Sequence, residues 1–146
     1  MPKEEFNPLA LEEQICFPIY ATSRLITRLY QPLLDEIGLT YTQYLVMMVL
    51  WENDNQKVTE IGNRLFLNTN TLTPLLNKLI QKKLISKQRD ESDERAFIVT
   101  LSEEGKAMKT SAECIPEKLA QSVDIPLEEV ALVKSAMWKF LNSVRD

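Results

Sequence analysis

The order of predicted elements between Lys57 and Gly105 constrains this chain more than any other feature of its sequence. A short helix is predicted from Thr59, as its N-cap, to Leu65 or Phe66, and a turn follows. A longer helix then begins after the capping segment 68–70 and runs to about Lys82. Two helices joined by so short a polar turn are typical of a helix-turn-helix.

A charged hairpin follows the second predicted helix. The runs 84–88 and 97–101 are β-like, and the tip between them extends from Arg89 to Arg95. A helix-turn-helix followed by a two-stranded hairpin is a winged helix-turn-helix, a module that places one helix in a groove of DNA. The order of elements therefore predicts a DNA-reading lobe.

The second helix carries the side chains that such a reader needs. Its N-terminal half offers donors and acceptors that suit phosphates or base edges, and a cation follows: Asn68, Thr69, Asn70, Thr71, Thr73 and Lys78. Five apolar residues can hold its opposite side to a core: Leu72, Leu75, Leu76, Leu79 and Ile80. Helix capping and turn formation explain one or two of the polar residues equally well.

The hairpin tip carries the other candidate DNA contacts. Arg95 is long enough to enter a narrow minor groove. Asp93, two residues earlier, would share one side of a strand-like segment with Arg95 and could orient it. Arg89 and Lys87 are expected to contact phosphates.

Charge is distributed unevenly along the chain. The net charge is −4, yet residues 57–95 hold eight basic and five acidic residues, and the remainder holds nine basic and sixteen acidic ones. The reading segment is therefore positive by three charges on an otherwise acidic chain, as a DNA-binding face requires. Taken alone, this pattern fits a solvated charged surface about equally well.

The segments before the reader are predicted to be helical. Apolar spacing predicts a helix over about 9–34, which either starts near Cys16 or bends there because of Pro18. Pro32 predicts a second break, with Gly38 closing a short helix. Thr40 and Gln43 form a capping-box pattern before a helix that is apolar nearly all round, so this helix should be the buried centre of the domain.

The segments after the reader are also predicted to be helical. Ser102 is a good N-cap for a helix that continues through Met108 and Cys114 to about Ala120, with a bend at Pro116. A last helix starts at Pro126. The predicted fold class is therefore mainly α with a small β-wing.

Composition excludes several other classes. No run approaches the ~20 apolar residues that cross a bilayer, and the N-terminus lacks a signal-peptide pattern, so no membrane partner and a cytoplasmic location are expected. Two cysteines in such a compartment do not form a structural staple. The chain has no histidine, the commonest metal ligand and general base, so no metal and no cofactor are expected.

Four runs of sequence carry a family resemblance. The run DERAFIVTLSEEG, after LTPLLNKL, resembles the MarR family of dimeric winged-helix regulators. The runs LEEQICFPIY and LTYTQYLVMMVLWE are similar to the organic hydroperoxide resistance regulators, whose members release DNA when a cysteine near the first helix is oxidised. The resemblance covers about residues 9–145. It implies one domain, 1–146, with dimerisation helices at 9–37 and 102–146 around a winged helix-turn-helix lobe at 40–101.

Cys16 is the candidate sensor under this resemblance. It lies near a helix start, where the dipole favours a thiolate. Without histidine, tyrosine hydroxyls must stabilise that thiolate; Tyr20, Tyr30 and Tyr41 are candidates, and the resemblance assigns the role to Tyr30 and Tyr41. Cys16 and Tyr30 would lie about 21 Å apart on one straight helix, so Tyr30 must approach from a dimer partner or across a sharp bend. The alternative is a Cys16 that is a small buried apolar residue.

The resemblance also implies a mechanism. Peroxide converts Cys16 to a sulfenic acid, which condenses with a second thiol, and the two reading helices lose their match to half-sites about 34–36 Å apart. The second thiol is either a low-molecular-weight thiol or Cys114 of the partner subunit; Cys114 could equally be a buried helix cysteine. Pro18 departs from the family pattern and could alter how the first helix responds.

Three hypotheses about function follow. The first is a dimeric repressor that binds double-stranded operator DNA and senses organic hydroperoxides or related oxidants. The second is a MarR-like regulator relieved by a small aromatic ligand in the dimer crevice, with Cys16 structural. The third is a peroxidase, which is the weakest because no arginine-rich motif surrounds Cys16 and Arg24 lies two turns away. The chain is therefore not expected to be an enzyme.

Overall fold

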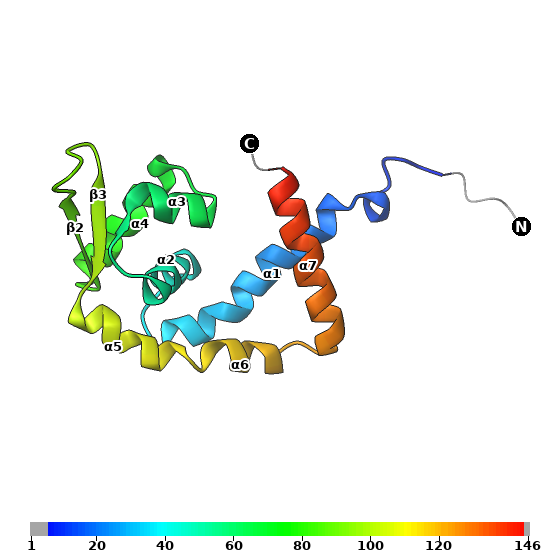
Figure 1. Ribbon diagram of the computed structural model, residues 1–146. Coiled ribbons are helices and arrows are strands. Elements are labelled where there is room, and N and C mark those ends of the chain that lie inside the picture. Colours follow the sequence, from blue (N-terminus) through cyan, green and yellow to red (C-terminus); the bar gives the residue numbers. More distant parts are fainter. Residues whose placement is uncertain (1–5, 145–146) are drawn as a thin grey trace, which may run out of the picture. The chain divides into compact units, whose positions relative to one another are not determined.

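The structure is a computed structural model that describes residues 6–144, and it is mainly helical with one small antiparallel sheet (Figure 1). This confirms the predicted fold class. The elements in chain order are η1 (Leu11–Glu13), α1 (Cys16–Asp35), α2 (Tyr41–Glu52), β1 (Gln56–Lys57), α3 (Val58–Leu65), α4 (Thr69–Gln81), β2 (Ile85–Arg89), β3 (Phe97–Leu101), α5 (Glu103–Ala112), α6 (Ile115–Gln121) and α7 (Leu127–Ser143).

The chain divides into two compact units, Met1–Ile115 and Pro116–Asp146. The first unit contains the sheet and the helices up to α5, and its core is built from α2, α3, α4 and the sheet. The second unit consists of most of α6 and all of α7, and no residue of α7 is buried within the chain. No helix within residues 6–144 is both long enough and apolar enough to cross a membrane.

The sheet is the predicted hairpin with one further strand. β2 and β3 pair antiparallel, with Arg89 opposite Phe97. The two-residue strand β1 pairs with the other edge of β3, through Gln56 opposite Val99. Sequence did not predict β1, because two residues are too few to show an alternating pattern.

The helix α2 occupies the centre of the first unit, as its apolar composition predicted. Its buried residues cover more than half of its circumference, and Leu45 and Met48 on the remaining side are half-buried. The buried residues are Gln43, Tyr44, Val46, Met47, Val49 and Leu50. Its N-terminus has the predicted capping box, in which the Thr40 hydroxyl accepts from the Gln43 N–H and the Gln43 side chain accepts from the Thr40 N–H. Contacts from α1, α3, α4 and α5 surround it.

The helix α1 begins at Cys16 and continues to Asp35, so the predicted break at Pro32 is wrong. Pro18 lies in the first turn, where its missing N–H is tolerated. Pro32 lies in the last turn and is exposed, so it removes a single bond near an end that would fray in any case. Gly38, at φ 71°, closes α1 itself: its N–H bonds to Asp35 O, and Leu39 N–H bonds to Leu34 O.

Two further helix boundaries differ from the prediction. The N-cap of α3 is Lys57, whose N–H donates to the Glu60 carboxylate at 2.7 Å, and Thr59 lies within the helix. The helix after Ser102 does not continue to Ala120 but ends at Ala112, and α6 starts at Ile115. Pro116 lies in the first turn of α6, where its missing N–H is tolerated, so the proline is compatible with a new helix start.

Candidate nucleic-acid interface and thiol sites

The start of α4 combines one structural residue with several exposed polar ones. The Asn68 side chain accepts from Thr71 N–H at 2.9 Å, so Asn68 is the N-cap. Thr69, Asn70 and Thr71 have exposed side chains. The capping alternative therefore applies to Asn68 and leaves the next three residues available for DNA contacts.

The remaining predicted residues of α4 divide between its two faces. Thr73 is half-buried and Lys78 is exposed. Leu72, Leu76 and Leu79 are buried in the core, which confirms the predicted inner side of the helix. Leu75 and Ile80 are half-buried at the edges of this side.

The turn between α3 and α4 depends on two residues that sequence analysis did not single out. Phe66 takes a left-handed conformation, at φ 56°, and Leu67 N–H bonds to Gly62 O at 2.9 Å. A Cβ on Gly62 would lie 2.8 Å from Leu67 O, closer than atoms approach. Gly62 thus permits the tight approach that sets α4 against α3. A glycine inside a helical pattern was the signal available in the sequence.

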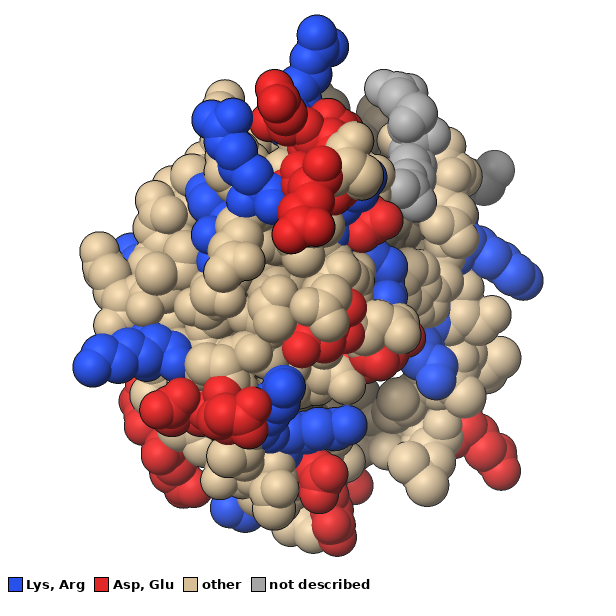
Figure 2. All heavy atoms as spheres, turned by 60° about the vertical axis from the view of Figure 1, so that its left-hand side comes forward, with Lys and Arg blue, Asp and Glu red and all other residues tan. Residues whose placement is uncertain are grey.

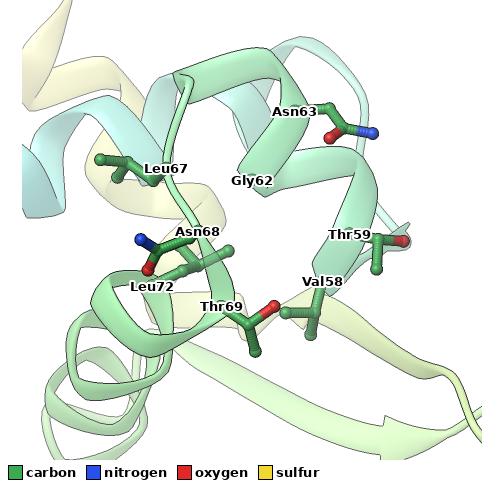
Figure 3. Close-up of a pocket in the computed structure, with 8 residues that line it drawn as sticks. All are labelled: Val58, Thr59, Gly62, Asn63, Leu67, Asn68, Thr69 and Leu72. Carbon is green, nitrogen blue, oxygen red and sulfur yellow. The ribbon is translucent and has the colours of Figure 1, made fainter. Parts of the chain in front are cut away.

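A hollow of about 200 Å³ lies at this turn, and Figure 3 shows that α3, the turn and α4 all line it. Its lining residues are Val58, Thr59, Gly62, Asn63, Leu67, Asn68, Thr69 and Leu72. Ligand pockets are commonly ~300–1,000 Å³. The hollow is smaller than that range, so it is better regarded as the groove between two packed helices.

The wing carries two cations against one aromatic ring. The Lys87 ammonium lies 5.1 Å and the Arg89 guanidinium 5.7 Å from the centre of the Phe97 ring. Arg89 and Phe97 face each other across the β2–β3 pair, and Lys87 lies two residues before Arg89 on the same face. Cation–π contacts of this kind hold both long side chains on one face of the wing. The sequence pattern indicated the two cations but gave no sign of the role of Phe97.

The wing tip places Asp93 and Arg95 differently from the prediction. The two residues lie in a turn and not on a strand. The Asp93 carboxylate accepts from the backbone N–H of Arg95 at 3.0 Å, and Ala96 N–H bonds to Asp93 O at 2.9 Å. Asp93 therefore fixes the backbone of the tip, and the side chain of Arg95 is exposed.

A second carboxylate, Asp90, joins the wing to the start of α3. It accepts from the Ser92 N–H at 3.0 Å and from the Ser92 hydroxyl at 2.8 Å, and its Oδ2 lies 3.5 Å from Lys57 Nζ. These two bonds from Ser92, with the Lys57 charge adding to them, lower the pKa of Asp90 below its ordinary value. Asp90 was not predicted, because its partner Lys57 is distant in sequence.

Basic and acidic side chains are interspersed over the side of the molecule that bears the sheet and α4. Figure 2 turns this side forward and shows no single continuous basic patch. On the face that Figure 2 shows, the net positive charge of residues 57–95 does not form one continuous basic surface. Four of its five carboxylates lie in the tip itself: Asp90, Glu91, Asp93 and Glu94. Any DNA contact by the wing must bring its cations closer to the phosphates than these four carboxylates.

Cys16 is exposed and is the first residue of α1. The interpretation of Cys16 as a buried apolar residue is therefore wrong for the single chain. The N–H groups of Cys16 and Phe17 are free at this helix start, whereas Pro18 has none to offer an anion. Tyr20 follows Cys16 by one helical turn on the same face, and the Arg24 guanidinium lies 5.5 Å from the centre of the Tyr20 ring.

Tyr30 and Tyr41 form a separate aromatic cluster near the other end of α1. Their ring centres are 4.8 Å apart, and Tyr44 lies 5.9 Å from Tyr30. Burial, with Tyr41 and Tyr44 adding to it, raises the pKa of Tyr30 to about 12. Burial also raises the pKa of Tyr41. The hydroxyls therefore stay protonated at neutral pH and can donate hydrogen bonds.

The unbroken α1 separates Cys16 from this cluster. Fourteen residues of one helix place Cys16 and Tyr30 about 21 Å apart. The bend proposed from sequence as a way to bring them together is absent, since α1 runs through both residues. Within one chain, the structure thus brings Tyr30 and Tyr41 together but leaves Cys16 beside Tyr20 alone.

Cys114 is exposed and lies between α5 and α6, so the interpretation of Cys114 as a buried helix cysteine is wrong for the single chain. Its Sγ lies 3.7 Å from Ser111 O, a weak contact that leaves the sulfur accessible. Among residues 6–144, no group of three or more histidine, cysteine, aspartate or glutamate side chains is arranged to hold a metal ion.

Comparisons with known proteins agree with this geometry. Residues 28–111 match the model of the transcriptional regulator SarA/Rot family. The chain is 37% identical over 142 residues to the organic hydroperoxide resistance transcriptional regulator of Bacillus subtilis, covering 97% of each chain.

Two solved structures of one regulator are also similar. The structure of reduced AbfR bound to DNA is 35% identical, with a TM-score of 0.75, over 92% of this chain and 94% of that one. The structure of disulfide-formed AbfR is 34% identical, with a TM-score of 0.64, over 92% and 91%.

Proposed function

Because this chain belongs to the MarR family of winged helix-turn-helix transcriptional regulators, in the branch of the organic hydroperoxide resistance regulators, we propose that it is a dimeric repressor that senses organic hydroperoxides or related oxidants through Cys16 and then releases its operator. It is a DNA-binding transcriptional regulator and not an enzyme, in line with its relatives. What we propose is the oxidant signal, the homodimer, repression rather than activation of transcription, and a cytoplasmic location.

The observation that carries the proposal is the exposed thiol of Cys16 at the first residue of a continuous helix. The thiolate attacks the peroxide, the O–O bond breaks, and the leaving alkoxide takes a proton to become an alcohol. Sulfur is oxidised to sulfenic acid as the peroxide is reduced. A second thiol then condenses with the sulfenic acid, forming a disulfide and releasing water. Related structures named as reduced, DNA-bound AbfR and as disulfide-formed AbfR support this sequence of events.

A homodimer would complete the thiol site. Tyr30 and Tyr41 cannot reach Cys16 in their own chain, so we expect their hydroxyls to stabilise the thiolate of the partner subunit. Exposed apolar side chains on α1, including Phe17, Leu25 and Ile26, form a hydrophobic surface that a partner subunit would bury. The exposed apolar side chains of α7, such as Leu132 and Trp138, supply another. Sedimentation equilibrium should give twice the chain mass of 16.9 kDa.

The DNA contacts follow from the exposed and half-buried polar residues of α4 and the wing. We assign base and phosphate contacts to Thr69, Asn70, Thr71 and Thr73, with Lys78 on a phosphate. Asn68 caps the helix, and the polar atoms of its side chain that the cap does not use are available for DNA contacts. On the wing, Lys87 and Arg89 contact phosphates, and Arg95 enters the minor groove from a tip fixed by Asp93.

The test is a band-shift measurement with and without cumene hydroperoxide. The probe is a duplex selected from a random-sequence pool by the reduced wild-type protein. Peroxide should release wild-type protein and leave the Cys16→Ser variant bound. Release of the Ser variant as readily as wild type would exclude Cys16 as the sensor and favour a regulator relieved by a small aromatic ligand.

The identity of the second thiol has its own experiment. Exposed Cys114 makes an intersubunit Cys16–Cys114 disulfide one candidate, and a low-molecular-weight thiol the other. Non-reducing gels of peroxide-treated protein should show a dimer band that Cys114→Ser removes. An unchanged band in Cys114→Ser, or a monomer whose mass rises by that of an added small thiol, would assign the step elsewhere.

A further inference from the structure

The side chain of Lys82 crosses from the end of α4 to the connection between α1 and α2. Lys82 is the C-cap of α4, and its ammonium donates to the backbone oxygen of Gly38 and to Gln43 Oε1, the latter at 3.0 Å. Gln43 is 2% exposed, and the same Oε1 accepts from Thr40 N–H at 3.1 Å. One buried amide oxygen therefore joins the cap of α2 to the end of α4. We call these two bonds from Lys82 the Lys82 tether.

Electrostatics favours the ammonium at this place. Gly38 belongs to the closing turn of α1, so its carbonyl lies at the negative end of that helix dipole. Lys82 also lies at the negative end of α4. A cation between two helix C-termini is stabilised by both, which gives an exposed lysine a preferred position that a simple surface ion pair lacks.

The tether acts on the helix that faces DNA. Leu72, Leu76 and Leu79 hold the inner side of α4 to the core by apolar packing, which is less directional than hydrogen bonding. Hydrogen bonds at the C-terminal end of α4 are directional and resist small rotations of the helix. Base readout needs donors and acceptors held within about 0.5 Å, so a small rotation of α4 weakens recognition.

We propose that Lys82 is a positioning residue for DNA recognition, which orients α4 through Gly38 and Gln43 without touching DNA itself. This inference rests on the proposed function only in that α4 is the DNA-reading helix. It also links the reading helix to the α1–α2 connection. Tyr30 and Tyr41, whose rings are in contact, lie on either side of this connection in the sequence. The same connection is where movement of α1 would reach α4.

The test measures duplex affinity of the reduced protein across a range of salt concentrations, using the selected duplex described above. Lys82→Met should weaken binding at least about fivefold, the loss of one well-made base contact, with the slope of log affinity against log salt unchanged. Lys82→Arg should restore most of the affinity. Lys83→Met is the matched control, because it removes the same charge one residue later. Its duplex affinity should be at least as high as that of Lys82→Arg.

Gln43→Met supplies an independent arm, since a buried residue cannot contact DNA. It should weaken binding as Lys82→Met does, and the double variant should be no weaker than either alone. Thr40→Ala removes the cap of α2 without touching the tether, and should bind as wild type. Active protein is counted by titration well above the dissociation constant; if Lys82→Met fails to fold, Gln43→Met against Thr40→Ala decides.

Three results would overturn the proposal. Lys82→Met or Gln43→Met with wild-type affinity would show that the tether does not orient α4. A salt slope that falls by about one in Lys82→Met would make Lys82 a phosphate contact instead. A wild-type protein that selects no duplex would overturn both this inference and the proposed function, whereas wild-type selection with unaffected variants would overturn this inference alone.

Discussion

The indole Nε1 of Trp51 donates a hydrogen bond of 2.8 Å to the backbone oxygen of Gly105, which joins the end of α2 to the start of α5. Trp51→Phe keeps much of the packing but removes this hydrogen bond, so we expect a loss of about 0.5–1.5 kcal/mol in the free energy of unfolding. Gly105→Ala should cost more, because its Cβ would lie 2.1 Å from Leu84 O. Urea denaturation measures both, and a Gly105→Ala variant as stable as wild type would contradict this account.

Asn68 and Asn70 should behave differently although they are two residues apart in one polar cluster. Asn68→Ala removes the N-cap of α4 and should lower the free energy of unfolding by about 1 kcal/mol. Asn70→Ala should change stability by less than about 0.5 kcal/mol while weakening duplex binding. Thermal denaturation and fluorescence anisotropy on the same samples separate the two roles. Equal stability losses in both variants would refute the distinction.

Arg95→Ala should weaken duplex binding by about 1–3 kcal/mol if its guanidinium enters the minor groove. Asp93 supplies a sharper comparison. Asp93→Asn keeps an oxygen that can accept from the Arg95 N–H, so it should bind at least as well as wild type, whereas Asp93→Ala should bind less well. Equal losses in both Asp93 variants would mean that the carboxylate charge, and not the turn, is what matters. Lys106→Ala, on α5, is the control for the loss of one cation.

Tyr30 predicts a loss of stability at high pH. Its pKa rises from 10.0 to about 12 on folding, so the native state keeps the phenol proton where the unfolded chain loses it. The stabilisation is complete below pH 10 and is lost as pH rises to about 12. The urea midpoint should therefore fall across this range, and fall less steeply in Tyr30→Phe. Phenolate absorbance of the folded protein gives the pKa directly, and a Tyr30 that ionises near 10 would contradict the prediction.

Local patterns predicted the reading module because its signals lie within a few residues of one another. The cap at Asn68, the apolar side at Leu72 and Leu76, and the strand from Phe97 to Leu101 all agree with the structure. The predicted effects of prolines on helix boundaries agreed less well with the structure. Pro32 did not end α1, and Pro116 started a new helix, because the effect of a proline depends on its distance from a helix end.

The candidate sites divide in the same way. Cys16, Arg89 and Arg95 could be named from residue type and position. Their surroundings could not, since Phe97 under Arg89 and Lys57 beside Asp90 come from other elements of the fold. The role assigned to Asp93 changed from orienting a side chain to fixing a turn, because the backbone path of the hairpin tip cannot be read from alternation.

The sequence by itself determined the class of fold and the position of the helix expected to read DNA, since helix periodicity and capping act over three or four residues. It named the two thiol candidates but not their exposure. Only the tertiary structure decided that the rings of Tyr30 and Tyr41 contact each other far from Cys16, and that Lys82 bonds to Gly38 and Gln43. The latter contacts join residues some forty positions apart. They depend on how α1, α2 and α4 pack, and packing is settled by the fit of whole surfaces rather than by any local pattern.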